Sequence, residues 1–403
     1  MASPASGREA LLYWLALHLV PGLGTSNAVK LIRRLGSPER VFHASVSELV
    51  GCGVRAAVAQ SIVSGVSFEE AAAEADRVRA AGVEIIPLHD PRYPAHLKEI
   101  YDPPILLYAR GRTELLAESK IAVVGSRRPS PYGTAVACKL SEELATAGLV
   151  IVSGMARGID SAAHHGALRA GGATIAVLGC GVDVIYPSEN KKLAAEIAAR
   201  GLIVSEFPMG SVAFPQNFPI RNRIISGLSD GVLVVEGAQY SGSLITARLA
   251  LDQGREVFAV PGSIISKLSW GPNLLIKQGA TLVQQWQDVV ESLPEPVRGA
   301  IWRALQEKLQ QQVLPGVGDS TSGESAGAPA ASEGRAGEGP GSALSPLEKR
   351  LLGLVQADAS IHIDALIGQL DENSPSEIIA ALCELELAGQ IRQLPGKSYV
   401  RVW

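Results

Sequence analysis

Basic, aromatic and small side chains flank one continuous apolar run of the sequence, Val232-Leu233-Val234-Val235, which is typical of a strand buried on both faces of a parallel sheet. Phe218, Arg221 and Arg223 come before this run, and the turn Ser241-Gly242-Ser243 comes after it. Arginine side chains and the free amides at a helix N-terminus both bind phosphate, and an aromatic ring can stack on a nucleotide base. These residue types at this spacing favour recognition of a polyanion.

Further basic residues follow other expected strands. They are Arg127 and Arg128, with Ser126 beside them, after the run 121–124, and Lys191 and Lys192 after Tyr186-Pro187. In a doubly wound sheet these loops collect at one edge, so we expect them to form one groove with the amides of residues 241–243. Each charge taken alone equally suits a solvated surface residue, and Arg223 could instead pair with Glu236 or Asp230.

The patterns that mark cofactor and metal chemistry are missing from the same loops. After Gly179 and Gly181, Val184 stands where the third glycine of a dinucleotide fingerprint would fall, and Ser153 is not centred in a G-x-S-x-G nucleophile motif. The four cysteines lie far apart, without metal-ligand or disulfide spacing. We therefore expect no cofactor, no metal and no catalytic residue, which favours a binding protein over an enzyme.

Asp160 and His164 stand four residues apart, so they would share one face of a helix. That spacing fits an acid/base pair, a metal pair or a contact that only stabilises the helix. Because a second histidine follows directly in a segment rich in glycine and alanine, we expect packing rather than catalysis.

The elements that must position these loops alternate between strand and helix from residue 120 onward. The expected strands are 121–124, 149–152, 174–178, 202–205, 232–235 and 256–260, each followed by small or polar residues. Such alternation predicts βαβ units, and hence a parallel sheet with helices on both faces. The expected fold class is α/β, with a Rossmann-like, doubly wound, mainly parallel sheet.

Helical periodicity before the sheet predicts an all-α N-terminal domain, in which the turn Pro21-Gly22-Leu23-Gly24 separates two helices. The turn resembles the hairpin of helix-hairpin-helix modules, whose amides hold a DNA phosphate. It equally suits a small helical bundle that uses the turn for packing alone.

The last segment of the chain predicts a winged-helix module. Two capping boxes, 345–348 and 374–377, begin helices with a proline at the first helical position, and a strand-turn-strand pattern follows over 391–402. The second helix contains Glu384-Leu385-Glu386-Leu387, which is more acidic than a helix that reads DNA should be. An interaction or structural role is therefore favoured, and DNA contact stays open.

The expected domain boundaries follow from these changes of pattern. They are a helical SAM/helix-hairpin-helix-like domain over 1–82, an extended connector over 83–119, the sheet domain over 120–292, a connecting helix over 293–314, a flexible linker over 315–345 and the winged-helix-like domain over 346–403. In the linker 23 of 31 residues are Gly, Ser, Ala or Pro, so it has too few apolar side chains to order itself.

The overall composition narrows the class of protein. Of 403 residues 47% are hydrophobic and 19% are charged, which excludes a disordered or fibrous chain. The net charge of −4 excludes a protein that is basic throughout, although residues 120–290 carry 15 basic against 12 acidic side chains. The apolar patch at 11–20 is too short to span a membrane, so we expect no membrane contact. The widely spaced cysteines, which suggest no disulfide framework, suit a reduced cytoplasm, so we expect a cytoplasmic protein.

Several ordered motifs closely resemble the DNA-processing protein A (DprA/Smf) family. They are Val123-Val124-Gly125-Ser126-Arg127, Ser153-Gly154-Met155-Ala156-Arg157-Gly158-Ile159-Asp160, Ala163-His164, Tyr186-Pro187, Ser205-Glu206, the segment 218–225, the segment 241–247 and Val260-Pro261-Gly262. The match extends from about residue 93 to residue 279. Met155, where leucine is more usual in the family, is a small apolar departure.

The resemblance implies a Rossmann-like domain without cofactor chemistry that binds single-stranded DNA and forms a homodimer. It also implies that the protein protects incoming DNA and loads the RecA recombinase onto it in natural transformation and recombination, with single-strand-binding protein as a further partner. Carried over by motif, the residues that contact DNA would be Ser126 and Arg127, Lys191 or Lys192, Phe218, Arg221 and Arg223, with the turn at 241–243 supplying backbone donors. The motif does not decide which of the two lysines matches.

Two other functions stay open at the level of sequence. A related Rossmann-like family hydrolyses nucleoside monophosphates and carries P-G-G-x-G-T-x-x-E after the equivalent strand. Here residues 236–243 read EGAQYSGS, without those glycines or the following glutamate. The other alternative is a scaffold that binds RecA but not DNA.

Overall fold

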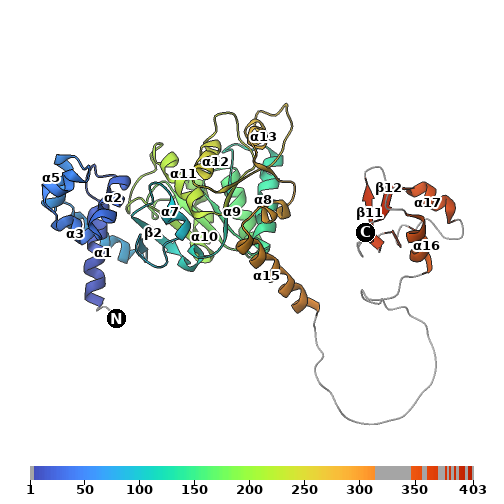
Figure 1. Ribbon diagram of the computed structural model, residues 1–403, viewed down its shortest axis with the longest axis horizontal. Coiled ribbons are helices and arrows are strands. Elements are labelled where there is room, and N and C mark those ends of the chain that lie inside the picture. The colour runs from blue at the N-terminus through green and yellow to red at the C-terminus, as the bar shows by residue number, and fades with distance from the viewer. Residues whose placement is uncertain are drawn as a thin grey trace, which may run out of the picture. The chain divides into compact units, whose positions relative to one another are not determined.

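The computed structural model describes residues 4–313, 346–355, 361–370, 377–378, 381–382, 385–386, 390–394 and 398–401. They belong to two compact units, Met1–Val317 and Gly318–Trp403 (Figure 1).

The first unit begins with six helices. They are α1 (Pro4–His18), α2 (Thr25–Leu35), α3 (Pro38–His43), α4 (Val46–Gly51), α5 (Ala56–Val63) and α6 (Phe68–Ala80). Serine caps fix where two of the short helices begin, since the Ser37 hydroxyl accepts a hydrogen bond from the Arg40 amide and Ser45 forms a capping box with Glu48. The expected all-α N-terminal domain is confirmed, and Figure 1 shows these helices beside the β2 end of the sheet.

The turn between α1 and α2 has a packing role in this structure. Leu23 is fully buried within it, and the Gly22 carbonyl accepts a hydrogen bond of 3.4 Å from Arg55 at the start of α5. Gly22 and Gly24 both have positive φ, a conformation that side chains disfavour, which is why the turn needs glycine there.

A nine-stranded sheet follows, with the strand order β1-β2-β6-β5-β4-β3-β7-β8-β9. The strands are β1 (Glu84–Pro87), β2 (Leu106–Gly111), β3 (Lys120–Val124), β4 (Val150–Ser153), β5 (Thr174–Leu178), β6 (Leu202–Ser205), β7 (Gly231–Val234), β8 (Glu256–Ala259) and β9 (Thr281–Leu282). Strands β3 to β9 pair in parallel, and six of them coincide with the six expected strands. The direction of winding reverses at β3, between β4 and β7, where doubly wound sheets place their ligand sites.

Helices cover both faces of the sheet. They are α7 (Ala95–Glu99), α8 (Pro131–Thr146), α9 (Ile159–Arg169), α10 (Lys191–Arg200), α11 (Asn217–Leu228), α12 (Gly242–Asp252), α13 (Trp270–Lys277), α14 (Trp286–Glu291) and α15 (Glu295–Val313), with short 3-10 turns at Thr113–Leu116 and Ser188–Asn190. Side chains of β3 alternate between two cores, because Ile121 and Val123 pack in one cluster and Ala122 and Val124 in the other. The doubly wound, mainly parallel fold is therefore confirmed.

The segment 83–119 differs from the expected extended connector, because it adds two strands to the sheet. β1 pairs with β2, and β2 pairs antiparallel with β6, placing Tyr108 opposite Ser205. The reason is the run Leu106-Leu107-Tyr108-Ala109, whose side chains are all buried and need a sheet to cover them. The segment is thus an edge of the sheet domain.

Helix α15 lies where the sequence predicts a connecting helix. Ile301 is buried against the sheet domain, and Trp302 lies 5.8 Å from Trp286 of α14, centroid to centroid. The expected linker 315–345 lies outside the described residues, as do Ser345 and Ser374, which begin the two expected capping boxes.

The described part of the second unit contains α16 (Pro346–Leu354), β10 (Ile361–His362), α17 (Ile363–Gln369), β11 (Ile391–Leu394) and β12 (Ser398–Arg401). The strands form a small antiparallel sheet in the order β10-β12-β11. Its core includes Leu351, Leu366 and Leu382. This arrangement of helices and a hairpin fits the expected winged helix.

Among the described residues, no helix is both long and apolar enough to cross a membrane.

Candidate nucleic-acid interface

A cavity of about 530 Å³ lies at the carboxyl edge of the sheet, and we call it the carboxyl-edge cavity. It is lined by the loops that follow β3 and β4, the first turns of α11 and the first turn of α12. Seven of the residues singled out from the sequence line it: Ser126, Arg127, Phe218, Arg221, Ser241, Gly242 and Ser243. The parallel strands bring these residues together from positions more than a hundred apart in the chain.

The exposed wall of the cavity combines a cation with an aromatic ring. The Arg127 guanidinium carbon lies 5.1 Å from the centroid of the Phe218 ring, a cation–π distance. The Tyr186 ring lies 5.7 Å from Phe218 and also lines the cavity, and it is half exposed. Tyr186, whose ring the sequence offers beside Phe218 as a surface on which a base could stack, therefore lies in the same cavity.

Another part of the cavity lining is the N-terminus of α12. Ser241 is the N-cap residue, and its side chain caps none of the helix amides. Its hydroxyl instead lies 2.7 Å from the hydroxyl of Ser243. The Ser241 and Leu244 amides donate to backbone carbonyls, so the amides of Gly242 and Ser243 are the ones left to hold an anion, with hydroxyl groups beside them.

Arg221 lies in the floor of the cavity. Its side chain is buried, and Nη1 donates hydrogen bonds to the carbonyls of Gly154, at 2.7 Å, and Val177. Burial lowers the pKa of the Arg221 guanidinium to about 10, so the group stays charged at neutral pH. A Cβ on Gly154 would collide with this guanidinium, which explains why glycine stands there.

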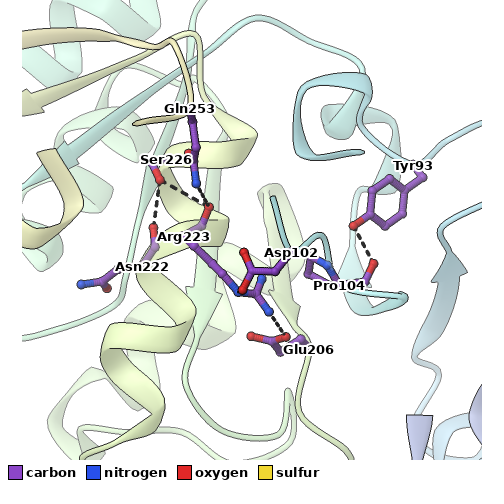
Figure 2. A network of polar contacts seen from close by, with 8 residues as sticks. All are labelled: Tyr93, Asp102, Pro104, Glu206, Asn222, Arg223, Ser226 and Gln253. Atoms are coloured by element: carbon purple, nitrogen blue, oxygen red, sulfur yellow. Dashed lines mark hydrogen bonds and ion pairs between the residues drawn. The ribbon is translucent and has the colours of Figure 1, made fainter. Parts of the chain in front are cut away.

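Arg223 lies outside the cavity, in a group of ion pairs that we call the Arg223 junction: the buried Arg223 and Glu206, and the partly exposed Asp102 (Figure 2). Its Nη2 lies 2.5 Å from Glu206 and its Nε lies 3.1 Å from Asp102. Gln253, directly after the last residue of α12, donates a hydrogen bond to the Arg223 carbonyl, which links the end of α12 to α11.

The expectation that Arg223 faces a phosphate therefore needs correction in this structure. Residues two apart on a helix point about 200° apart, so Arg221 and Arg223 cannot both face the cavity. The pairings considered from the sequence are also not made. Glu236 accepts hydrogen bonds from Ser130, and Asp230 accepts one from the Lys120 amide.

Three other expected cations do not line the cavity. Arg128 follows Arg127 but is exposed beyond the lining, and its amide donates to the Ser126 hydroxyl. Lys191 and Lys192 are exposed in the first turn of α10. The structure leaves open which lysine would contact a ligand.

Asp160 and His164 have separate partners rather than one another. His164 is fully buried, its Nδ1 lies 2.7 Å from the Thr174 hydroxyl, and burial lowers the pKa of its imidazole to about 3. The packing role expected for this histidine agrees with those contacts. Asp160 instead lines the cavity and accepts hydrogen bonds from the amides of Gly154 and Ala156.

Burial raises the pKa of the Asp160 carboxyl, while the charge of Arg221 opposes that rise. Asp160 is a lining residue that sequence reasoning did not assign to the groove. Its position at the start of an expected helix directly after the second strand was the available signal, since such positions face the carboxyl edge.

Comparisons with known proteins agree with this fold. Residues 84–294 match the family model described as DNA recombination-mediator protein A, and residues 335–397 match the DprA winged helix domain. The chain is 48% identical to the DNA processing protein DprA of Bacillus subtilis (strain 168), over 54% of this chain and 73% of that protein. It is 41% identical to the protein Smf of Escherichia coli (strain K12), over 79% of this chain and 77% of that protein.

The X-ray structure of DNA processing protein A from Streptococcus pneumoniae is also similar. The two superpose with a TM-score of 0.64 at 38% identity, covering 70% of this chain and 98% of that one. One model covers the whole sheet, including β1 and β2, and the other covers residues 346–397 of the expected winged helix. The chain therefore belongs to the DprA/Smf family of DNA-processing proteins.

Proposed function

We propose that this protein binds single-stranded DNA in the carboxyl-edge cavity and delivers it to the recombinase RecA during natural transformation and recombination. The observation that supports the proposal is the pairing of an aromatic ring with two separate anion donors in one cavity. Phe218 offers the ring, Arg127 offers a fork of charged donors, and the start of α12 offers free amides.

An aromatic ring in the lining suits a flexible single strand better than a duplex. A base can reach the Phe218 ring only if it is unpaired and turned away from its neighbours, because a duplex hides base faces in the stack. Phosphates on either side of that base would then meet Arg127 and the turn at 241–243. In this proposal Arg127 leaves the face of Phe218 when a base stacks there.

Arg221 supports this site from below. Its guanidinium carbon lies 6.0 Å from the Phe218 centroid, and its charge is held in the floor by two backbone carbonyls. A buried charge raises the local potential without contacting a phosphate. We therefore propose Arg221 as an electrostatic support and Arg127 as the direct contact.

Beyond the cavity, we propose that Arg128 and one of Lys191 and Lys192 continue the path of the strand. All three are exposed, so they are free to meet phosphates that leave the cavity. Cytoplasmic location, a homodimer, RecA, single-strand-binding protein and the absence of catalysis are also part of this proposal, and they come from the family resemblance. Whether the winged helix contacts DNA or protein is left to experiment.

Fluorescence anisotropy with a labelled single strand and its duplex tests the DNA-binding step. We expect a clear preference for the single strand, and weaker binding as salt rises because counterions are released. Arg127→Ala should lower the affinity, whereas Arg112→Ala, which removes an arginine paired with Glu114, is the matched control. Equal affinity for single strand and duplex, or unchanged binding by the Arg127 variant, would overturn the proposal.

RecA filament assembly on strands coated with single-strand-binding protein tests the delivery step. We expect faster assembly with the wild-type protein than with Arg127→Ala. Assembly that is equally fast with both would favour a scaffold that binds RecA without DNA. Release of free base from a nucleoside monophosphate would instead favour the hydrolase alternative.

A further inference from the structure

One group in the carboxyl-edge cavity has no evident use in binding a polyanion. Asp160 is a carboxylate, 7% exposed, among residues that otherwise attract negative charge. Both of its hydrogen bonds, from the amides of Gly154 at 3.1 Å and Ala156 at 3.4 Å, end on the same oxygen, Oδ2. Within the described part of the chain, the other oxygen, Oδ1, has no hydrogen-bond partner.

Oδ1 is not among the fully buried polar atoms that lack a partner, so it is open to the cavity. A ligand that excludes water from this oxygen without supplying a donor would leave it unsatisfied, which is costly, so a ligand that brings a donor is favoured. Phosphates do not qualify, because they carry the same charge and no proton at neutral pH. The sugars within a DNA strand carry no free hydroxyl. The remaining donors of single-stranded DNA are the N–H groups on the edges of its bases.

Base chemistry then separates the possible partners. Cytosine, adenine and guanine carry an exocyclic amino group that can reach a single acceptor, which is how carboxylates recognise cytosine N4. Thymine and uracil have a carbonyl at that position, and their one ring N–H lies between two carbonyl oxygens that repel a carboxylate. The cavity would therefore distinguish amino-bearing bases from keto bases.

We infer that Asp160 is a specificity-determining residue, which accepts a hydrogen bond through Oδ1 from the amino group of the base stacked on Phe218. The inference rests on the proposed binding of single-stranded DNA and deepens it, because it states which bases that site prefers. Phe218 and Asp160 line the same cavity, and Arg221 lies beside both of them. Stacking supplies affinity for any base, and the carboxylate adds a preference among bases.

The cleanest comparison uses oligonucleotides of deoxycytidine and of deoxyuridine, because the two bases have similar stacking faces and differ at the 4-position and N3. In an anisotropy titration above neutral pH, we expect the wild-type protein to bind the cytosine strand roughly tenfold more tightly than the uracil strand. A difference of about tenfold is the size expected for one hydrogen bond to a charged group. A strand of N4,N4-dimethylcytosine, which has lost both donors, should lose that advantage with the unaltered protein.

Asp160→Asn keeps an oxygen for the amides of Gly154 and Ala156 and replaces Oδ1 by an amino group. We expect its cytosine-to-uracil affinity ratio to fall to about one or to invert, since the new donor suits a carbonyl. Loss of the negative charge alone would tighten binding to both strands equally and leave the ratio unchanged. Asp183→Asn, which alters a carboxylate outside the cavity lining, is the control and should keep the wild-type ratio.

The possible outcomes separate this inference from the proposed function. Binding of both strands with affinities within about twofold, or an unchanged ratio in Asp160→Asn, would overturn the role of Asp160 while leaving single-strand binding intact. Failure of the wild-type protein to bind either strand would overturn both. If Asp160→Asn does not fold, the dimethylcytosine strand still decides the question with the wild-type protein.

Discussion

The carboxyl-edge cavity and the Arg223 junction both contain charged side chains of α11 and its neighbours, but their charges are satisfied in different ways. In the cavity, the Arg127 guanidinium is exposed and rests on an aromatic ring. In the junction, Arg223 is buried between Glu206 and Asp102 (Figure 2). For these two arginines, the charge that we propose for a ligand stays on the surface, whereas the charge that holds elements together is paired inside the protein.

The junction also joins helix α11 to the ends of two paired strands, β2 and β6. Asp102 precedes β2, Glu206 follows β6 and Arg223 belongs to α11. His18 at the end of α1 forms a hydrogen bond with the backbone of Glu206, and Glu74 of α6 accepts one of 2.7 Å from the Met209 amide. The N-terminal helices are therefore tied to the same loop that α11 packs against.

Removing the Arg223 side chain from the junction should have the largest effect, and that effect is on the stability of the folded protein. We expect Arg223→Ala to lower the free energy of unfolding by about 3–5 kcal/mol, because Glu206 would be left as an uncompensated buried charge. Denaturant unfolding followed by circular dichroism measures this. The double variant Arg223→Met with Glu206→Gln should recover much of the loss, and a change below about 1 kcal/mol for Arg223→Ala would contradict a structural role.

Acid should destabilise the folded protein through two buried histidines. Burial lowers the pKa of His18 to about 4 and that of His164 to about 3, against 6.5 for an ordinary histidine. Below pH 6.5 the unfolded chain binds protons that the folded chain does not. Each histidine should therefore lower the free energy of unfolding by about 1.4 kcal/mol per pH unit, until the pH reaches its folded-state pKa.

Unfolding curves between pH 7 and about pH 5 check this second prediction. His18→Gln combined with His164→Gln should flatten the pH profile, whereas substitution of the exposed His43 should not. None of the described residues that line the carboxyl-edge cavity is a histidine, so the loss of unfolding free energy at acid pH comes from histidines outside the cavity lining. A profile that stays level over this range in the wild-type protein would refute the assignment.

Removing the Phe218 ring from the carboxyl-edge cavity should weaken the binding of a single strand more than it lowers the free energy of unfolding. We expect Phe218→Ala to weaken binding of a single strand by about 1–3 kcal/mol, the contribution of stacking one base, in an anisotropy titration. Phe218→Tyr keeps an aromatic face and should retain most of the affinity. Equal affinities for the alanine variant and the wild-type protein would mean that bases stack elsewhere.

Single substitutions of the two lysines of α10 should have the smallest effects. The logarithm of the binding constant falls linearly with the logarithm of the salt concentration, and each lysine that contacts a phosphate contributes about one to the slope. Lys191→Ala or Lys192→Ala should therefore reduce that slope by about one. The other variant should match the wild-type protein within error. Unchanged slopes for both would remove these lysines from the path of the strand.

The sequence determined much of this protein before any tertiary contact was known. Alternating strands and helices fixed the parallel sheet, because apolar runs of four or five residues must be buried on both faces. The parallel sheet in turn predicted that Arg127, Phe218 and the turn at 241–243 would meet, since the carboxyl ends of parallel strands share one edge. The sequence suffices for these two predictions, because strands and helices are recognised from residues that are neighbours in the chain.

Only the tertiary structure decided what each charge does. Arg221 donates to carbonyls 67 and 44 residues away, and no periodicity specifies such partners. Arg223, which the sequence placed in the groove, lies in the junction, and Asp160, which the sequence did not assign to the groove, lines the cavity. The physical reason is that burial and pairing of a charge depend on distances between elements, which the packing of the whole domain sets.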